Sequence, residues 1–143
     1  MIRITANPVD VDEVIRVASV PGAGAVNVFI GTIRDTAAGK KVVHLEYEAY
    51  EPMAVSETQK VVDEAAGRWE LMGWAVSHRV GTLKPGEVAV AVAVSTKHRQ
   101  ASFEACQYII DKLKERVPIF KKEVFEDGAE WISALSEKQT TRR

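Results

Sequence analysis

Cysteine and long apolar runs are scarce in this 143-residue sequence. The single cysteine, Cys106, excludes a disulfide framework, a zinc cluster of cysteines and a CxxC redox motif. The longest apolar run, Val88 to Val94, is far shorter than the roughly 20 residues that a membrane-spanning helix needs. The first residues lack the apolar core of a signal peptide. We therefore expect a cytoplasmic protein that does not insert into a membrane.

An excess of one charge is also missing. The chain has 19 Lys and Arg against 20 Asp and Glu, a formal net charge of -1. This balance argues against nucleic acid or an anionic membrane as the partner, because both attract proteins with a positive excess. The sequence has no P-loop, GxGxxG or Ser-His-Asp order, and His44 and His78 lack ligand-like spacing. We expect no metal and no cofactor.

The remaining composition is that of one globular domain. Hydrophobic residues make up 46% and charged residues 27% of the chain, which is enough apolar material for a single core. We assign residues 1–135 to this domain and expect the polar tail 136–143 to fray.

Hydrophobic periodicity predicts an α+β fold. Several expected strands follow one another without a helix between them, which favours a mixed or antiparallel sheet, and we expect helices on one face of it. In the clearest helix, Phe103, Cys106, Ile110, Leu113 and Val117 form one apolar seam. The expected strands cover residues 2–4, 25–33, 42–50, 74–80, 88–95 and 119–125, the helices cover 10–20, 52–69 and 100–117, and a short segment at 128–134 closes the chain.

Three cationic residues, Lys97, His98 and Arg99, precede the helix 100–117. The helix dipole places partial positive charge at this end, so acidic residues would be favoured there. A bound anion would explain the exception, since free N–H groups at a helix start suit phosphate or carboxylate. A solvated turn whose charges point away from the protein explains it equally well.

Lys114 lies near the apolar seam of the same helix, about 60° from its centre at 100° per residue. A stem that runs over the core would leave its amine partly desolvated, which favours the neutral form. The alternative is a lysine that reaches solvent at a helix C-terminus, where a cation complements the dipole.

Strand alternation separates Lys121 from Lys122. Lys121 shares a face with Ile119, Glu123 and Phe125, whereas Lys122 points the other way. These lysines either belong to a site or protect an edge strand from aggregation.

Arg34 follows the buried strand 25–33, where loops often carry binding residues, and a guanidinium suits phosphate or carboxylate. It could equally form a surface turn with Asp35. The segment 97–122 holds seven Lys and Arg against three acidic residues, which favours a small anionic ligand or an acidic peptide tail.

Several blocks together resemble one family, the large, catalytic subunit of molybdopterin synthase (MoaE). The likeness extends from about residue 25 to 131, with Phe120 where the family often has Trp. The matching blocks are FIGTIR at 29–34, LEYEAY at 45–50, HRVG at 78–81 with PGE at 85–87, STKHR at 95–99, and DKLKERVP with IFKKE at 111–123.

The resemblance implies an α/β-hammerhead fold and a homodimer within a heterotetramer. It implies a small ubiquitin-like partner (MoaD) whose C-terminal Gly-Gly thiocarboxylate supplies sulfur to cyclic pyranopterin monophosphate, forming the molybdopterin dithiolene. By the same resemblance Lys114 and Lys121 are the catalytic lysines. The residues implied in substrate binding are Thr32, Ile33, Arg34, His98, Arg99, Lys122 and Glu123.

The residues alone leave another hypothesis open, a non-catalytic module that binds a phosphorylated small molecule or an acidic peptide tail. This hypothesis requires positive charge at Lys114 but no titrating amine.

Overall fold

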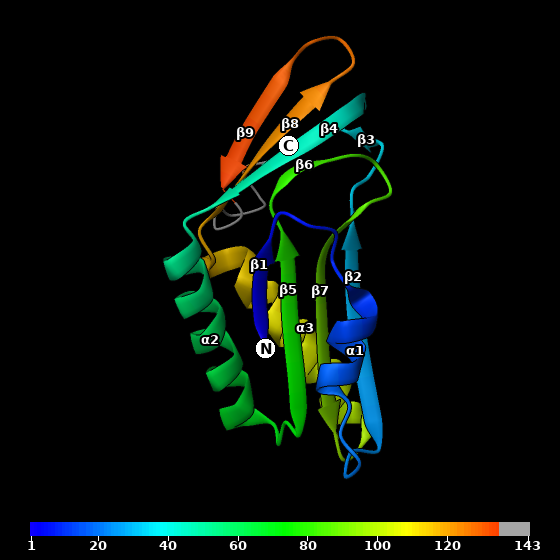
Figure 1. Ribbon diagram of the computed structural model, residues 1–143, viewed down its shortest axis with the longest axis vertical. Helices are drawn as coiled ribbons and strands as arrows, with labels where there is room; N and C mark the ends of the chain where they lie inside the picture. Colours follow the sequence, from blue (N-terminus) through cyan, green and yellow to red (C-terminus); the bar gives the residue numbers. More distant parts are fainter. Residues whose placement is uncertain (135–143) are drawn as a thin grey trace.

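The computed structural model describes residues 1–134, and the tail 136–143 of the sequence-based prediction lies outside them. The predicted α+β class is confirmed (Figure 1). One sheet has the strand order β1-β5-β7-β2, with β1 parallel to β5 and the other neighbours antiparallel. Its strands are β1 (Ile2–Thr5), β2 (Ala25–Thr32), β5 (Gly73–Arg79) and β7 (Val88–Thr96).

A second, antiparallel sheet stands beyond the ends of the first (Figure 1). Its order is β3-β4-β8-β9, and β6 pairs with β4 beside this path. The sequence pattern missed β3 and β6, which are too short to show a period. The strands are β3 (Thr36–Ala37), β4 (Lys40–Ala49), β6 (Gly81–Leu83), β8 (Ile119–Phe125) and β9 (Glu130–Ala134).

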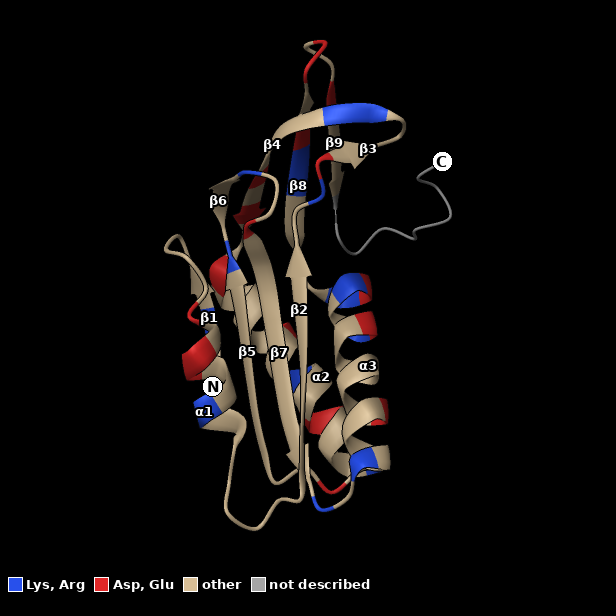
Figure 2. Ribbon diagram, turned by 90° about the vertical axis from the view of Figure 1, so that its right-hand side faces the viewer, with Lys and Arg blue, Asp and Glu red and all other residues tan. Residues whose placement is uncertain are grey.

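The helices α1 (Val11–Ala18), α2 (Glu51–Arg68) and α3 (Arg99–Arg116) cover both faces of the first sheet (Figure 2). The prediction of helices on one face is therefore wrong. α1 packs its buried residues on small alanines of β5 and β7, while α2 and α3 enclose the larger core on the other face. β7 is covered by helices on both faces, and such a strand has little room for polar side chains. This burial explains its run of Val and Ala.

The seam predicted for α3 is partly wrong. Phe103 is 59% exposed, whereas Cys106, Ile110 and Leu113 are buried as expected. Small Ser102 and Ala105 are the buried residues near the start of the helix, and small side chains there let it lie close to β2 and β7. The buried face of α3 therefore does not include Phe103.

Gly73, the first residue of β5, lies against the C-terminal end of α1 with no room for a side chain. A Cβ at this position would lie 2.3 Å from the carbonyl oxygen of Ala18, which is backbone and cannot rotate away. We expect Gly73→Ala to lower the free energy of unfolding by about 1–3 kcal/mol, measured by urea denaturation.

The matched control for that substitution is Gly67→Ala in α2. An added Cβ at Gly67 meets no atom within 4 Å, and alanine is the better helix former. It should raise stability by about 0.5–1 kcal/mol. Equal effects of the two substitutions would contradict the close approach at Gly73.

No helix among residues 1–134 is both long and apolar enough to cross a membrane.

Candidate functional site

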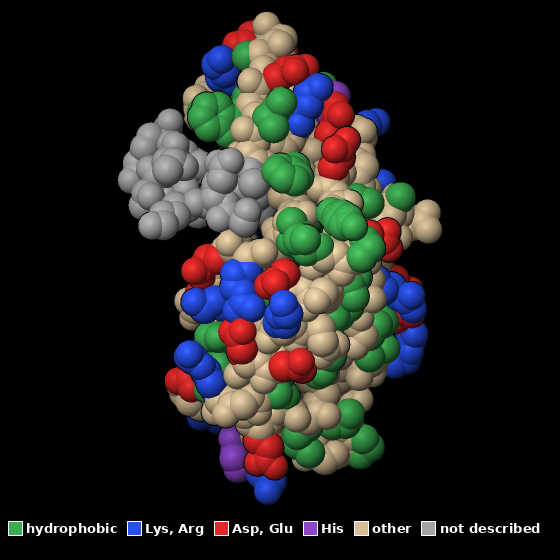
Figure 3. Space-filling view, turned by 90° about the vertical axis from the view of Figure 1, so that its left-hand side faces the viewer, with side chains coloured by type: hydrophobic (Ala, Val, Ile, Leu, Met, Phe, Trp, Pro, Cys, Tyr) green, Lys and Arg blue, Asp and Glu red, His purple; other side chains and the backbone are tan. Residues whose placement is uncertain are grey.

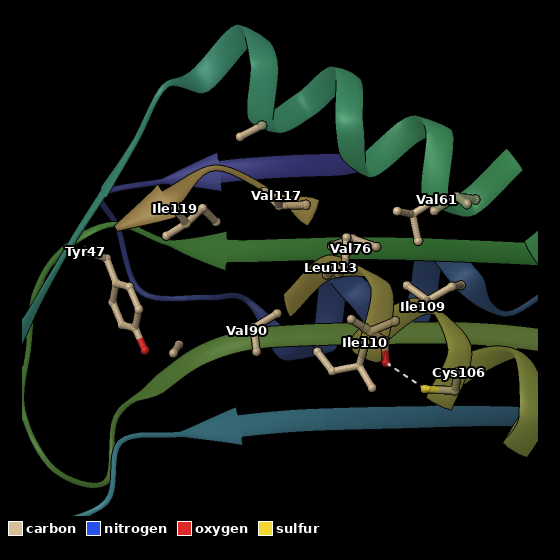
Figure 4. Close-up of a cluster of buried hydrophobic side chains, with 14 of the residues drawn as sticks. Tyr47, Val61, Val76, Val90, Cys106, Ile109, Ile110, Leu113, Val117 and Ile119 are labelled. Atoms are coloured by element: carbon tan, nitrogen blue, oxygen red, sulfur yellow. Dashed lines mark hydrogen bonds between the residues drawn. The ribbon is translucent and has the colours of Figure 1, made fainter. Parts of the chain in front are cut away.

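A cavity of about 520 Å³ lies between the two sheets, beside the C-terminal end of α3. Its apolar wall belongs to the main core, where Val76, Val90, Ile110 and Leu113 meet (Figure 4). β4 and β8 of the second sheet supply the polar wall. A cavity of this size that combines an apolar wall with convergent polar groups is typical of a small-molecule site.

Lys121 and Glu123 lie side by side on the β8 wall of the cavity. The Lys121 Nζ is 3.6 Å from the Glu123 Oε1, and the two side chains are 13% and 8% exposed. The predicted alternation is confirmed, because Ile119 and Phe125 on the same face are buried. An ion pair shielded from water interacts more strongly than a surface pair.

Lys114 reaches the cavity from the last turn of α3. The expectation of a partly desolvated amine is wrong here, since Lys114 is exposed while Lys112 and Arg116 are half-buried. Lys112 lies 5.7 Å from the centre of the Tyr108 ring, and Arg116 pairs with carboxylates of α2. Lys114 is thus the lysine of this helix end that lines the cavity.

Thr32, Ile33 and Arg34 reach the cavity from the end of β2. Ile33 is buried, and its backbone N–H donates to the carbonyl of Glu87 at 3.0 Å. Its own carbonyl accepts from the N–H of Gly86 at 2.8 Å. These bonds fix the backbone just before the exposed Arg34, whose guanidinium suits an anion at the cavity mouth.

The structure does not bring His98, Arg99 and Lys122 to this cavity within one chain. His98 is the N-cap of α3 and Arg99 its first residue, so at 1.5 Å per residue they lie roughly 20 Å along the helix from Lys114. Lys122 points to the opposite face of β8, with its Nζ 3.4 Å from the Glu130 Oε2.

Sequence reasoning missed two buried residues of the cavity, Tyr47 and His78. Their rings meet edge to face, with centroids 5.2 Å apart and planes at 82°. Burial lowers the pKa of His78 to about 4, so its imidazole is neutral at neutral pH. The feature of the sequence that could have identified His78 is its position in a predicted strand that is otherwise largely apolar.

The cavity contains no thiol, because Cys106 lies in the core. Burial raises the pKa of this thiol to about 11, so the reactive thiolate is scarce at neutral pH. Within residues 1–134, no three His, Cys, Asp or Glu side chains are grouped as ligands for a metal ion.

Comparison with known proteins agrees with the predicted resemblance. The catalytic subunit of molybdopterin synthase from Bacillus subtilis is 46% identical over 91% of this chain and 83% of its own length. The human protein of that name is 44% identical over 92% of this chain and 70% of its own length. A solved molybdopterin synthase from Staphylococcus aureus has a TM-score of 0.87 at 36% identity, covering 92% of this chain and 96% of that one.

The family model described as MoaE protein matches residues 4–116, which is more than half of the sequence and includes β1 and α1. The matched range contains Arg34, His78 and Lys114, which line the cavity described above. The chain therefore belongs to the MoaE family.

Proposed function

We propose that this chain is the catalytic subunit of a molybdopterin synthase. It transfers sulfur from the C-terminal thiocarboxylate of a small ubiquitin-like partner to cyclic pyranopterin monophosphate in the cytoplasm, and so forms the dithiolene of molybdopterin. The observation that carries this proposal is the placement of Lys114, Lys121 and Arg34, from three separate parts of the chain, on one cavity.

The charges of the cavity suit this reaction. A phosphate and a thiocarboxylate are both anions, and they approach each other only where fixed cations offset their repulsion. Lys40 joins the three cations already named, and the acidic residues of the lining are Glu123 and Glu130. Lys121 is paired with Glu123, so Lys114 and Arg34 at the exposed mouth are the groups best placed to meet incoming anions.

Sulfur arrives on the partner, so this chain needs no cysteine nucleophile, and Cys106 is accordingly a core residue. The chain's part is to hold both reactants and to move protons as oxygen leaves and sulfur adds. A lysine amine near the reacting carbon can donate or accept that proton. Lys114 and Lys121 are the amines so placed, while Thr32, Ile33, Arg34 and Glu123 line the substrate's position.

The surface offers area for the protein partners, a second copy of this chain and the small sulfur carrier. Hydrophobic side chains are exposed over the second-sheet half of the face in Figure 3. Phe120, Trp131 and Ile132 of β8 and β9 are 51%, 45% and 69% exposed. Phe120 and Ile132 share the face of β8 and β9 that points away from the cavity, and exposed apolar side chains of this kind are typical of protein interfaces.

The direct test mixes the purified chain with cyclic pyranopterin monophosphate and a thiocarboxylated small subunit, then assays molybdopterin. We expect product that depends on all three components. A chain that binds both reactants and yields no product would contradict the proposed function.

His98 and Arg99 require a second chain if they bind the same substrate, because each lies far from the cavity of its own chain. We expect Arg99→Ala and Lys114→Ala chains to be inactive alone and to recover activity when mixed. The mixed dimer would carry one intact site and one doubly altered site. Absence of recovery in verified mixed dimers would contradict a shared site and assign Arg99 another role.

A further inference from the structure

His78 is among the polar residues of the cavity that have no role in the proposed reaction. His78 lies in β5 on the same face as Val76, and its ring lines the cavity while the residue is 8% exposed. The neighbouring Ser77 shares the other face with Ala75, which packs against α1. His78 is therefore directed to the site by the alternation of the strand.

The hydrogen bonding of His78 fixes which ring nitrogen carries the proton. Its Nδ1 lies 2.8 Å from the backbone oxygen of Arg79. A carbonyl oxygen only accepts, so Nδ1 holds the hydrogen and Nε2 keeps a free lone pair. Within residues 1–134, the His78 imidazole makes no hydrogen bond other than this one.

The ring is also fixed in orientation and in charge. Tyr47 of the second sheet packs edge to face on it, so the imidazole is held between the two sheets. Burial lowers the His78 pKa to about 4. The charged groups around the cavity are Arg34, Lys40, Lys114 and the Lys121–Glu123 pair, with Glu130 of β9.

The acidic residues of the cavity are already engaged. Glu123 pairs with Lys121, and Glu130 pairs with Lys122 at 3.4 Å. The cations recognise anions, but a ring substrate of the pterin type also presents N–H and O–H donors. These donors lose their water on entering the cavity and need an acceptor there.

The geometry points to His78 as a substrate-binding residue, whose Nε2 accepts a hydrogen bond from an N–H or O–H group of the cyclic pyranopterin. This inference rests on the proposed function for the identity of the substrate. It adds a neutral imidazole acceptor, from the first sheet, to a site whose proposed catalytic groups are cations. The residue sets specificity, because an analogue that lacks the donor leaves Nε2 desolvated and unpaired.

Two substitutions separate this role from a structural one. In His78→Asn the side-chain amide can still donate to the Arg79 carbonyl, but nothing occupies the position of Nε2. In His78→Gln the longer amide places an oxygen nearer that position. We expect His78→Asn to raise the KM for cyclic pyranopterin monophosphate about tenfold with a smaller change in kcat, and His78→Gln to recover most of the loss.

Ser77→Ala is the matched control, since Ser77 is equally buried in the same strand but faces α1. It should leave KM unchanged. Thermal melting of each variant checks that the fold persists. A folded His78→Asn protein whose KM stays within twofold of the unaltered chain overturns the inference.

A second measurement does not depend on turnover. In the unaltered chain, ¹⁵N NMR should show His78 with Nδ1 protonated, and added cyclic pyranopterin monophosphate should shift the Nε2 resonance as hydrogen bonding does. An unshifted resonance at saturating compound overturns the inference. A shifted resonance in a chain that forms no dithiolene supports it and rejects the proposed function instead.

Discussion

Lys114→Ala is expected to lower the rate of dithiolene formation about 10²–10⁴-fold, the range lost when a positioned proton-transfer group is removed. Lys114 is an exposed residue of the cavity, so shortening its side chain removes no packing from the core. The melting temperature should therefore stay unchanged. Binding of the small subunit should persist, because the exposed apolar residues Phe120 and Ile132 are unchanged. The measurement is single-turnover formation of molybdopterin from preformed complex.

Lys114→Arg distinguishes catalysis from binding of an anion. Arginine keeps the positive charge but does not exchange a proton as a lysine amine can, so in the enzyme it should be nearly as damaging as alanine. In a module that only binds a phosphorylated ligand or an acidic tail, it should be nearly silent. Lys112→Ala is the control, since Lys112 lies two residues away beside Tyr108 and outside the cavity lining. Full activity of Lys114→Ala would reject the assignment of this lysine.

Local periodicity was sufficient for much of the fold. The strand β8 was predicted at its observed bounds, and the period of two placed Lys121 and Glu123 on one face and Lys122 on the other. The helix predicted over 10–20 is observed as α1, and its N-cap is Asp10, whose carboxylate accepts from the N–H of Glu13 at 3.0 Å. Both features are determined by residues that lie close together in the sequence.

Long-range geometry could not be obtained in the same way. The sequence pattern grouped Lys97, His98 and Arg99 in one basic segment with Lys114, yet the two groups lie at opposite ends of the 18-residue helix α3. Proximity along the chain overstated proximity in space, because a helix is rigid and about 1.5 Å long per residue. Tyr47 and His78 present the reverse case, since their contact depends on how two sheets pack and no local pattern encodes it.

Lys121 differs from the exposed Lys114 in being largely shielded from solvent, and its substitution should show two separable effects. Lys121→Met removes an amine from the cavity and leaves the Glu123 carboxylate, which is 8% exposed, without the ammonium 3.6 Å away. We expect activity to fall about 10²–10⁴-fold. We also expect the free energy of unfolding to fall by about 1–3 kcal/mol, because an acceptor is left desolvated without its cation. Urea denaturation and the molybdopterin assay measure the two effects.

The double variant Lys121→Met/Glu123→Gln assigns the cause of each loss. Neutralising Glu123 removes the buried charge that the Lys121 ammonium no longer offsets, so stability should return close to that of the unaltered chain. Activity should not return, because the site still lacks its amine. Recovery of both would instead identify Lys121 as a structural partner of Glu123, and catalysis would then depend on Lys114 and Arg34 at the mouth of the cavity. Glu123→Gln alone completes the cycle and yields the coupling energy of the pair.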